Sequence, residues 1–539
     1  MEYPTQKSIH SAFHSIWTAW LETTCELFPE QGSKLGFRKY DSRLGENSPS
    51  IHLTHIKLLE KTLRQVEDLP EVAFQGDSWL DRRGLISRLR TDLLFQRDLC
   101  RWRTNPQEHC NSAIDSIFEL VVRGADNLRR VLPAIESRLD AIPGYLAAGL
   151  ECVKSPDPLW TSLAVQSCAG SVEFLAGLEK DLAAASVNPA RVYSSIQSSI
   201  RAFNSYAAAI ARKQPGPKGG FAIGRERFEF LIREQLGLDL TLAEARAVGL
   251  HEISRHEHLL SEAAKRYGKK TAKTLIEEAA ESWAPDKPLI DLYLAETQTI
   301  KTRLKKIGLV TLPEHERLKV LPVPPFLRHQ FPTAAYSAPE PFSKNHTGIF
   351  WVNDLALEQS DPRRKAAEIR QHHGLGLTCV HEAYPGHHLQ FVTQFRHPSR
   401  LRRLFSHSIF YEGWTMWCEL NAVRHRLVDI PRAELIQLHD ALWRAHRIVI
   451  DCGLQEGTLS QAAAVKQLRS GVHFTAARAI ADVNWYTSSP SVPMSYLIGR
   501  LEVEKLHHRL VEKGSWNLKQ FNDWMLSHGA LPFSWIQRC

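Results

Sequence analysis

The sequence has few of the features that would place the protein in a membrane or on a nucleic acid. It contains no run of about 18 apolar residues, so we expect no membrane-spanning helix. Lysine and arginine number 67 against 59 aspartates and glutamates, and the resulting net charge of +8 is spread over 539 residues. Nucleic-acid binding would need this excess concentrated on one face or in one stretch. We therefore expect neither a nucleic acid nor a membrane as a partner.

Cysteines are few and follow no pattern. The nine cysteines are an odd number scattered from Cys25 to Cys539, and no two are spaced as Cys-x-x-Cys. In a chain of this size they indicate reduced thiols in a reducing compartment. Residues 1–20 lack a basic region followed by an apolar stretch, so we expect no signal peptide. The sequence thus predicts a soluble, cytoplasmic protein.

The chain is long enough to bury a large core without disulfides or a structural metal. Apolar residues recur at a spacing of three to four over residues 56–66 and 117–128, which is typical of amphipathic helices. The stretch Lys213–Gly220 is rich in proline and glycine and interrupts this pattern. We predict an N-terminal helical lobe, a linker and a catalytic lobe, at residues 1–212, 213–222 and 223–539.

One region of the second lobe has a different pattern. Residues 318–323, 333–337 and 348–353 are strand-like, and prolines punctuate them. They predict one small antiparallel sheet over about residues 318–353. Helical patterns resume afterwards and continue almost to the end of the chain. The predicted fold is therefore mainly α, a large multi-helix fold with this sheet placed just before the residues that carry chemistry.

Those residues begin with three histidines and one glutamate within eight positions: His381, Glu382, His387 and His388. In many zinc proteases a helix carries H-E-x-x-H, in which two histidines four apart bind the metal and the glutamate acts as general base. Here the residue four after His381 is Pro385. The segment therefore departs from the common pattern and needs a different geometry to bind a metal.

Two geometries are open. Pro385 removes a helical hydrogen bond and Gly386 tolerates unusual backbone angles, so the pair can bulge the helix and bring His387 beside His381. In a straight helix His388 would share a face with His381, but seven residues rise about 10.5 Å, whereas both rings must reach about 2.1 Å from one ion. We favour His387 as the ligand, with His388 orienting a ligand or contacting substrate. The alternative is a polar helix end with no metal.

A third ligand and a water position complete a catalytic zinc site. Glu412 and Glu419 lie seven residues apart, on one face of a largely apolar helix, so each needs a strong partner if buried. We predict Glu412 as the third ligand and Glu419 as the partner that orients a histidine. For Glu419 an exposed helix position is the alternative. The metal-binding helices then span about residues 372–425.

The remaining site candidates have plain structural alternatives. Glu382 would take a proton from the zinc-bound water and pass it to the leaving amine. Tyr496 would donate to the oxygen of the scissile carbonyl, unless it is a core tyrosine. Asn353, at the end of the last predicted strand, would close the pairing with an extended substrate or bind its terminus, unless it is a turn residue.

The segment His381–Gln390, followed by Glu412-Gly413-Trp414, resembles the bacterial family catalogued as domain of unknown function 885. The likeness extends over about residues 50 to 520. It includes residues 134–143, 223–231, 451–454 and 495–499. It implies a largely helical, zinc-peptidase-like fold, distantly similar to thimet oligopeptidase and angiotensin-converting enzyme, which also supply a glutamate ligand from a later helix. It also adds Asp451 to the residues expected to support the site or the substrate.

The chain departs from the family pattern at Gln455, Trp485 and Val492, which lie outside the metal motif. We predict a zinc-dependent hydrolase that cleaves an amide bond in a peptide or peptide-like small molecule. The departures motivate a second hypothesis, a metal-dependent tailoring enzyme of a biosynthetic pathway. A third is a helical binding protein without turnover. A homodimer is the assembly to test.

Overall fold

The computed structural model describes residues 5–124, 127–184, 190–323 and 333–538. The chain divides into two compact units, with the division at residues 221 and 222. In the described chain, one short segment of the strand region, Glu340–Ser343, belongs to the first unit. The described part of the second unit comprises residues 222–323, 333–339 and 344–538.

The first unit is helical throughout its described part. Its longer helices are amphipathic and bury one face each; in α1, for example, Phe13, Trp17 and Trp20 recur at helical spacing and are buried. Helix α7 packs against α6 and α9, and α1 packs against α3. The helices are α1 (Gln6–Leu27), α2 (Pro29–Lys34), α3 (Pro49–Glu67), α4 (Asp77–Leu93), α5 (Arg101–Thr104), α6 (Gln107–Arg123), α7 (Leu132–Cys152), α8 (Pro158–Ala184) and α9 (Ala190–Ala211).

The second unit contains both helices and the sheet. Its helices are α10 (Arg225–Glu234), α11 (Leu242–Lys265), α12 (Ala272–Ser282), α13 (Leu289–Ile307), α14 (Pro362–Arg370), α15 (Leu375–Glu382), α16 (His387–Gln394), α17 (Ser408–Arg424), α18 (Ala433–Glu456), α19 (Gln461–Gly471), α20 (Ala476–Ser488), α21 (Val492–His507), α22 (Leu518–Ser527) and α23 (Phe533–Ile536). No helix in the described ranges is long and apolar enough to cross a membrane.

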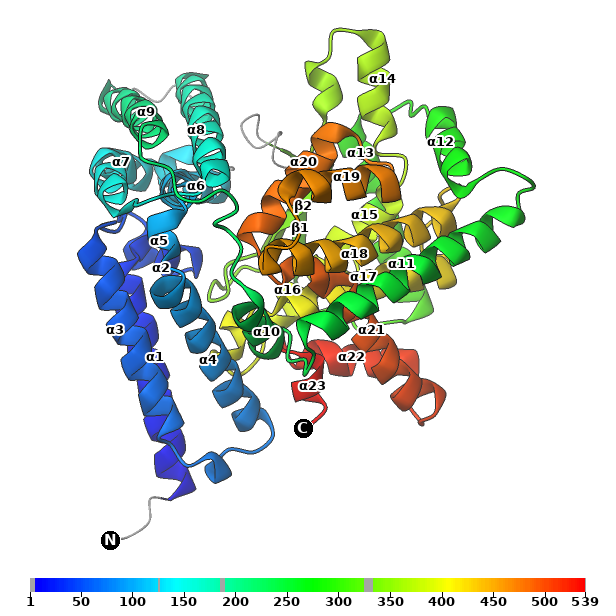
Figure 1. Cartoon of the computed structure of the whole chain (residues 1–539), viewed down its shortest axis with the longest axis horizontal. Coiled ribbons are helices and arrows are strands. Elements are labelled where there is room, and N and C mark those ends of the chain that lie inside the picture. The colour runs from blue at the N-terminus through cyan, green and yellow to red at the C-terminus, as the bar shows by residue number, and fades with distance from the viewer. Residues whose placement is uncertain (1–4, 125–126, 185–189, 324–332, 539) are drawn as a thin grey trace. The chain divides into compact units, whose positions relative to one another are not determined.

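Helix α17 lies at the centre of this unit. Its sequence is apolar on all sides, and Trp414 and Trp417 are among its fully buried side chains, as expected of a helix surrounded by others. It packs against α15, α16, α18 and α21, while α11 lies along α18 (Figure 1). The prediction of a mainly α fold is confirmed.

The sheet has three strands, β1 (Arg317–Pro322), β2 (Ala334–Ser337) and β3 (Thr347–Val352), in the order β1-β3-β2. The strands fall where the sequence predicts them, but the antiparallel prediction is wrong for one pair. Strand β3 is central, antiparallel to β2 and parallel to β1. The alternation of apolar residues and the prolines of a segment indicate a strand. They carry no information about which strand will pair with it or in which direction that strand runs.

Candidate metal centre

A break between α15 and α16 brings two histidines together. The amide of Gly386 donates to the carbonyl of Val380 at 3.0 Å, a bond that spans six residues instead of the four of an α-helix. Two residues are thus looped out of the helical path. As a result His387 stands one turn from His381, the place that a ligand four residues later has in a regular helix.

The break is held tightly. A Cβ on Gly386 would lie 1.9 Å from the carbonyl oxygen of His381 and 2.3 Å from that of Val380, so no larger residue fits there without moving the backbone. From the other side, the indole N–H of Trp414 on α17 donates to the carbonyl of Pro385 at 2.8 Å. The Pro-Gly pair and the buried tryptophan therefore fix the spacing of the two histidines.

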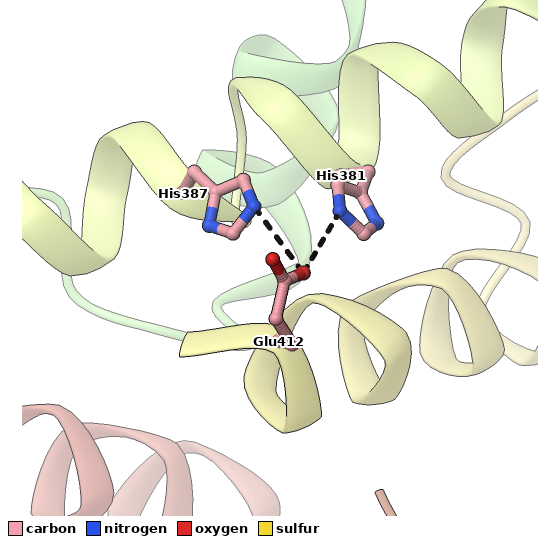
Figure 2. A group of neighbouring side chains, drawn as sticks. All are labelled: His381, His387 and Glu412. Carbon is pink, nitrogen blue, oxygen red and sulfur yellow. Dashed lines mark ion pairs between the residues drawn. The ribbon is translucent and has the colours of Figure 1, made fainter. Parts of the chain in front are cut away.

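Glu412 on α17 completes a group of three buried side chains. Its Oε2 atom lies 3.5 Å from Nε2 of His381 and 3.6 Å from Nε2 of His387 (Figure 2). One donor atom from each of the three residues lies within 4.8 Å of the others. The residues whose spacing in the sequence predicts a ligand set are thus the ones that the structure brings together.

The distances in this group fit a shared cation better than direct hydrogen bonds. Hydrogen bonds from a nitrogen to a carboxylate are about 2.7–2.9 Å long. Two ligand atoms about 2.1 Å from one tetrahedral zinc ion are about 3.4 Å apart, close to the two separations measured here. The Oε2 atom of Glu412 is also buried without a hydrogen-bond partner in the described chain. Two imidazoles and one carboxylate are the ligand set of several zinc hydrolases.

Glu419, two turns after Glu412 on α17, orients one of the rings. Its Oε1 atom lies 2.6 Å from Nδ1 of His381, and its side chain is buried. Since a carboxylate can only accept, Nδ1 of His381 donates its proton to Glu419, which leaves Nε2 as the ring nitrogen that faces Glu412. His387 lacks such support, because its Nδ1 atom has no partner in the described part of the chain.

Burial and crowded carboxylates shift the pKa values of the site. Burial lowers the pKa of His387 to about 4, so its ring is neutral at pH 7, as a ligand must be. Burial also lowers the pKa of His381, but Glu412 and Glu419 outweigh it and raise that pKa to about 10. Burial, with a contribution from the same two carboxylates, raises the pKa of Glu382 to about 7. This excess of negative charge is what a divalent cation would neutralise.

Glu382 is the last residue of α15 and is half-buried. Glu382 directly follows His381 in the chain. In the described ranges, the carboxyl group of Glu382 makes no hydrogen bond or ion pair. A carboxylate with no partner and a pKa near neutrality can take up and release a proton at pH 7.

His388 points away from this group into a second network. Its Nε2 atom lies 2.7 Å from Oε2 of Glu316, and its Nδ1 atom lies 3.0 Å from the hydroxyl of Tyr336 on β2. Glu316 also accepts a hydrogen bond from Tyr384 at 2.5 Å and pairs with Lys301 on α13. These contacts lower the pKa of Glu316 to about 2 despite its burial. His388 is thus held by protein groups on both nitrogens.

The sheet makes room for this network at one position. A Cβ on Gly348 of β3 would lie 2.4 Å from the Tyr336 hydroxyl and 2.6 Å from Nδ1 of His388. The ring of Tyr336 also stacks on that of His387, with centroids 6.4 Å apart. Sequence reasoning missed Glu316, Tyr336 and Gly348, which belong to no motif and lie far from the histidines along the chain.

Tyr496 on α21 reaches the candidate ligands because two helices cross closely. A Cβ on Gly413 of α17 would lie 2.7 Å from Cα of Gly499, so the two backbones touch at this point. The Tyr496 hydroxyl lies near the carboxylate of Glu412 and helps to lower its pKa. Its ring stacks on that of His381, with centroids 6.4 Å apart. The residue proposed as a donor to substrate therefore contacts a candidate ligand.

The other two candidates support secondary structure. Asn353 is fully buried after β3, where its amide donates to the carbonyl of Thr333. That amide is used within the protein and is not offered to an extended substrate. Asp451 on α18 accepts from the amides of Ser491 and Met494 and so caps the start of α21, the helix of Tyr496.

Comparisons with known proteins identify the fold but no activity. The family model described as "Bacterial protein of unknown function (DUF885)" matches residues 29–538. No curated protein matches the chain. A structure of "a putative lipoprotein of unknown function from Shewanella oneidensis" has a TM-score of 0.77, at 18% identity over 98% of this chain and 99% of that one. "The putative lipoprotein from Colwellia psychrerythraea" has a TM-score of 0.76, at 18% identity over 98% of each chain.

The predicted cytoplasmic location is wrong by this comparison, because both similar structures are described as lipoproteins, a description that points outside the cytoplasm. The prediction of a cytoplasmic location relied on the cysteines as a sign of a reducing compartment. The eight cysteines in the described ranges are free, and all but Cys100 are buried. Even the Cys110 and Cys168 thiols, which are close enough to interact, are free. Unpaired buried cysteines are compatible with either compartment, so they do not decide the location.

Proposed function

The chain belongs to this family of bacterial proteins of unknown function, and we propose that it is a zinc-dependent hydrolase that cleaves an amide bond in a peptide or peptide-like small molecule. The observation that carries the proposal is the buried Oε2 atom of Glu412. It has no hydrogen-bond partner in the described chain and lies 3.5 and 3.6 Å from the Nε2 atoms of His381 and His387.

These three residues would hold the zinc ion. When bound, zinc acts as a Lewis acid and lowers the pKa of a coordinated water to about 7. Glu419 keeps the Nε2 lone pair of His381 directed toward Glu412 through its hydrogen bond to Nδ1. Glu382 accepts a proton on its carboxylate and returns it to the departing nitrogen, which its pKa of about 7 allows at neutral pH.

Two tyrosines flank the site and are half-buried, so their hydroxyl groups can reach a bound molecule. Tyr336 comes from β2 and is oriented by His388. Tyr496 comes from α21 and is oriented by Glu412. The hydroxyl proton of Tyr336 is donated to Nδ1 of His388, so Tyr496 remains our candidate donor to the substrate oxygen that gains negative charge.

The first experiment measures metal content by mass spectrometry on protein purified without a histidine tag. We expect near-stoichiometric zinc in the unmodified protein, loss of zinc in His387→Ala, and retention in His388→Ala. The last variant is a matched control, because His388 is the next residue but faces Glu316. Absence of metal after added zinc would sink the hydrolase proposal and leave a helical binding protein.

Loss of zinc in His388→Ala with retention in His387→Ala would move the ligand to the other histidine. A screen of N-acylated peptides on the zinc-loaded protein then tests the reaction. Cleavage of an amide bond that stops in Glu382→Gln supports the proposal. Failure to cleave any peptide, together with conversion of a non-peptide small molecule, would instead support a tailoring enzyme.

A further inference from the structure

Two buried arginines lie beside the ring of Tyr496. Arg444 and Arg447 are nearly one turn apart on α18, and their side chains are 9% and 5% exposed. The guanidinium carbon of Arg447 lies 4.6 Å from the centre of the Tyr496 ring, and that of Arg444 lies 5.9 Å from it. The arginines are therefore one side chain removed from Glu412.

The hydrogen bonds of Arg447 leave part of its guanidinium unused. Its Nε atom donates to the Tyr486 hydroxyl at 2.9 Å, and Nη2 lies 3.6 Å from Oδ1 of Asp482. Its Nη1 atom is buried and has no hydrogen-bond partner in the described ranges. A buried charged donor without a partner is costly, so this nitrogen is a place where a ligand can supply the missing acceptor.

Arg444 is similarly incomplete. Its Nη1 atom lies 3.5 Å from Oδ1 of Asp440, and Nη2 lies 4.0 Å from Oε1 of Glu419, which is already bound by His381. Its Nε atom is buried without a partner in the described part of the chain. Both arginines thus present unused N–H groups close to one tyrosine.

The cluster contains three guanidinium groups and three carboxylates. Asp440 and Asp482 each pair with one of the two arginines, while a third guanidinium, Arg478, stacks on Trp443 and Phe474. Arg478 has no carboxylate within 4 Å in the described structure. Glu419 is the third carboxylate, but its Oε1 atom is shared with His381 and lies 4.0 Å from Nη2 of Arg444. The unused N–H groups, rather than an excess of charge, therefore indicate where a carboxylate could bind.

The cluster also reaches the surface. Trp485 is 37% exposed, and its ring lies 5.2 Å from the guanidinium carbon of Arg447. Arg478 is exposed beside it. Two positions at which the chain departs from the expected family pattern lie here, because Gln455 donates to the carbonyl of Tyr486 and Trp485 borders Arg447. Substrate selectivity particular to this chain would be expected at such a place.

We propose that Arg444 and Arg447 bind a free carboxylate of the substrate, so that the substrate of the candidate metal centre is a peptide-like acid. A guanidinium binds a carboxylate through two parallel N–H groups, and the tyrosine between the arginines and Glu412 sets the distance from the carboxylate to the reacting bond. That the bound acid is a substrate rests on the proposed function. Binding of the carboxylate itself does not require turnover.

The test compares two matched probes, N-benzoyl-glycyl-L-phenylalanine and its C-terminal amide, by isothermal titration calorimetry. Chelator-treated, metal-free protein is used, so that zinc cannot bind the carboxylate. We expect the acid to bind at least 10-fold more tightly than the amide. The preference should vanish in Arg447→Gln, be partly kept in Arg447→Lys, and persist in Arg246→Gln. Arg246 is the control because it pairs with Glu456 at the far end of α18.

Each outcome decides the matter. Equal affinity of the unmodified protein for acid and amide, or binding of neither, overturns the inference without any variant having to fold. A preference that survives in Arg447→Gln moves the carboxylate elsewhere and overturns it too. A preference for the acid in a protein that cleaves neither probe after zinc loading would keep the carboxylate site while counting against the proposed hydrolase. Cleavage of the acid and the amide at equal rates would support the proposed hydrolase and count against the carboxylate site.

Discussion

Replacing Gly386 by alanine tests whether the break between α15 and α16 makes the metal centre. The added Cβ would lie 1.9 Å from the carbonyl oxygen of His381 and 2.3 Å from that of Val380. Both obstacles are backbone atoms of α15, so no side chain can turn aside, and relief requires the break to open by about 1 Å. Overpacking of this kind costs about 1–3 kcal/mol of stability. Metal–ligand distances tolerate only about 0.2 Å, so a shift of this size displaces His387 as a ligand.

We therefore expect Gly386→Ala to lower zinc affinity at least 100-fold, measured by competition with a fluorescent chelator. Gly374→Ala is the matched control. Gly374 is the N-cap of the same helix, and its Cβ would meet only Ile436 at 3.5 Å, an ordinary contact. Thermal unfolding of both variants separates a local effect from loss of the fold. Zinc affinity within threefold of the unmodified protein in a folded Gly386→Ala would refute the reasoning.

Three further predictions follow from the same geometry. Glu382→Gln should keep zinc and lose about 10²–10⁴-fold in kcat; an unchanged rate would remove this residue from the mechanism. Glu419→Gln should lower zinc affinity about 10–100-fold, because it removes the carboxylate that orients His381. Zinc affinity is measured by chelator competition, and an unchanged affinity would show that this hydrogen bond is unimportant. His256 accepts from Arg500 and donates to a backbone carbonyl, and burial lowers its pKa to about 3. Because the unfolded chain takes up a proton on this histidine at a higher pH than the folded chain, its contribution to stability is complete above about pH 6.5 and is lost as the pH falls toward 3. The free energy of urea unfolding should therefore fall with acid, and less steeply in His256→Gln. Equal slopes in the two proteins would contradict this.

The candidate ligands could be predicted from the sequence because their relation is local. His381 and His387 are separated by one turn and a Pro-Gly bulge, and the hydrogen bond that skips two residues is the one that such a bulge requires. Glu412 and Glu419 share a face because two helical turns separate them. Helix geometry alone therefore relates the side chains within each pair.

The second network could not be predicted, because it depends on distant segments. His388 contacts Tyr336 and Glu316, which precede it by 52 and 72 residues. Each is a single polar residue in a segment without a motif. Glu316 directly precedes β1 and Tyr336 lies on β2, so the pairing of both strands with β3 brings them together. The parallel pairing of β1 with β3 could not be predicted from the pattern of the strands.

The same distinction separates the candidate metal centre from the proposed carboxylate site. The ligands lie on α15, α16 and α17, and their spacing is fixed by helix geometry and Gly386. The proposed carboxylate site depends on α18, α20 and α21, and α21 meets α17 where the backbones of Gly413 and Gly499 touch. Gln455 and Trp485 lie on α18 and α20. A change at either position would alter the surroundings of Arg447 without moving a candidate ligand, so the proposed carboxylate site can change independently of the candidate metal centre.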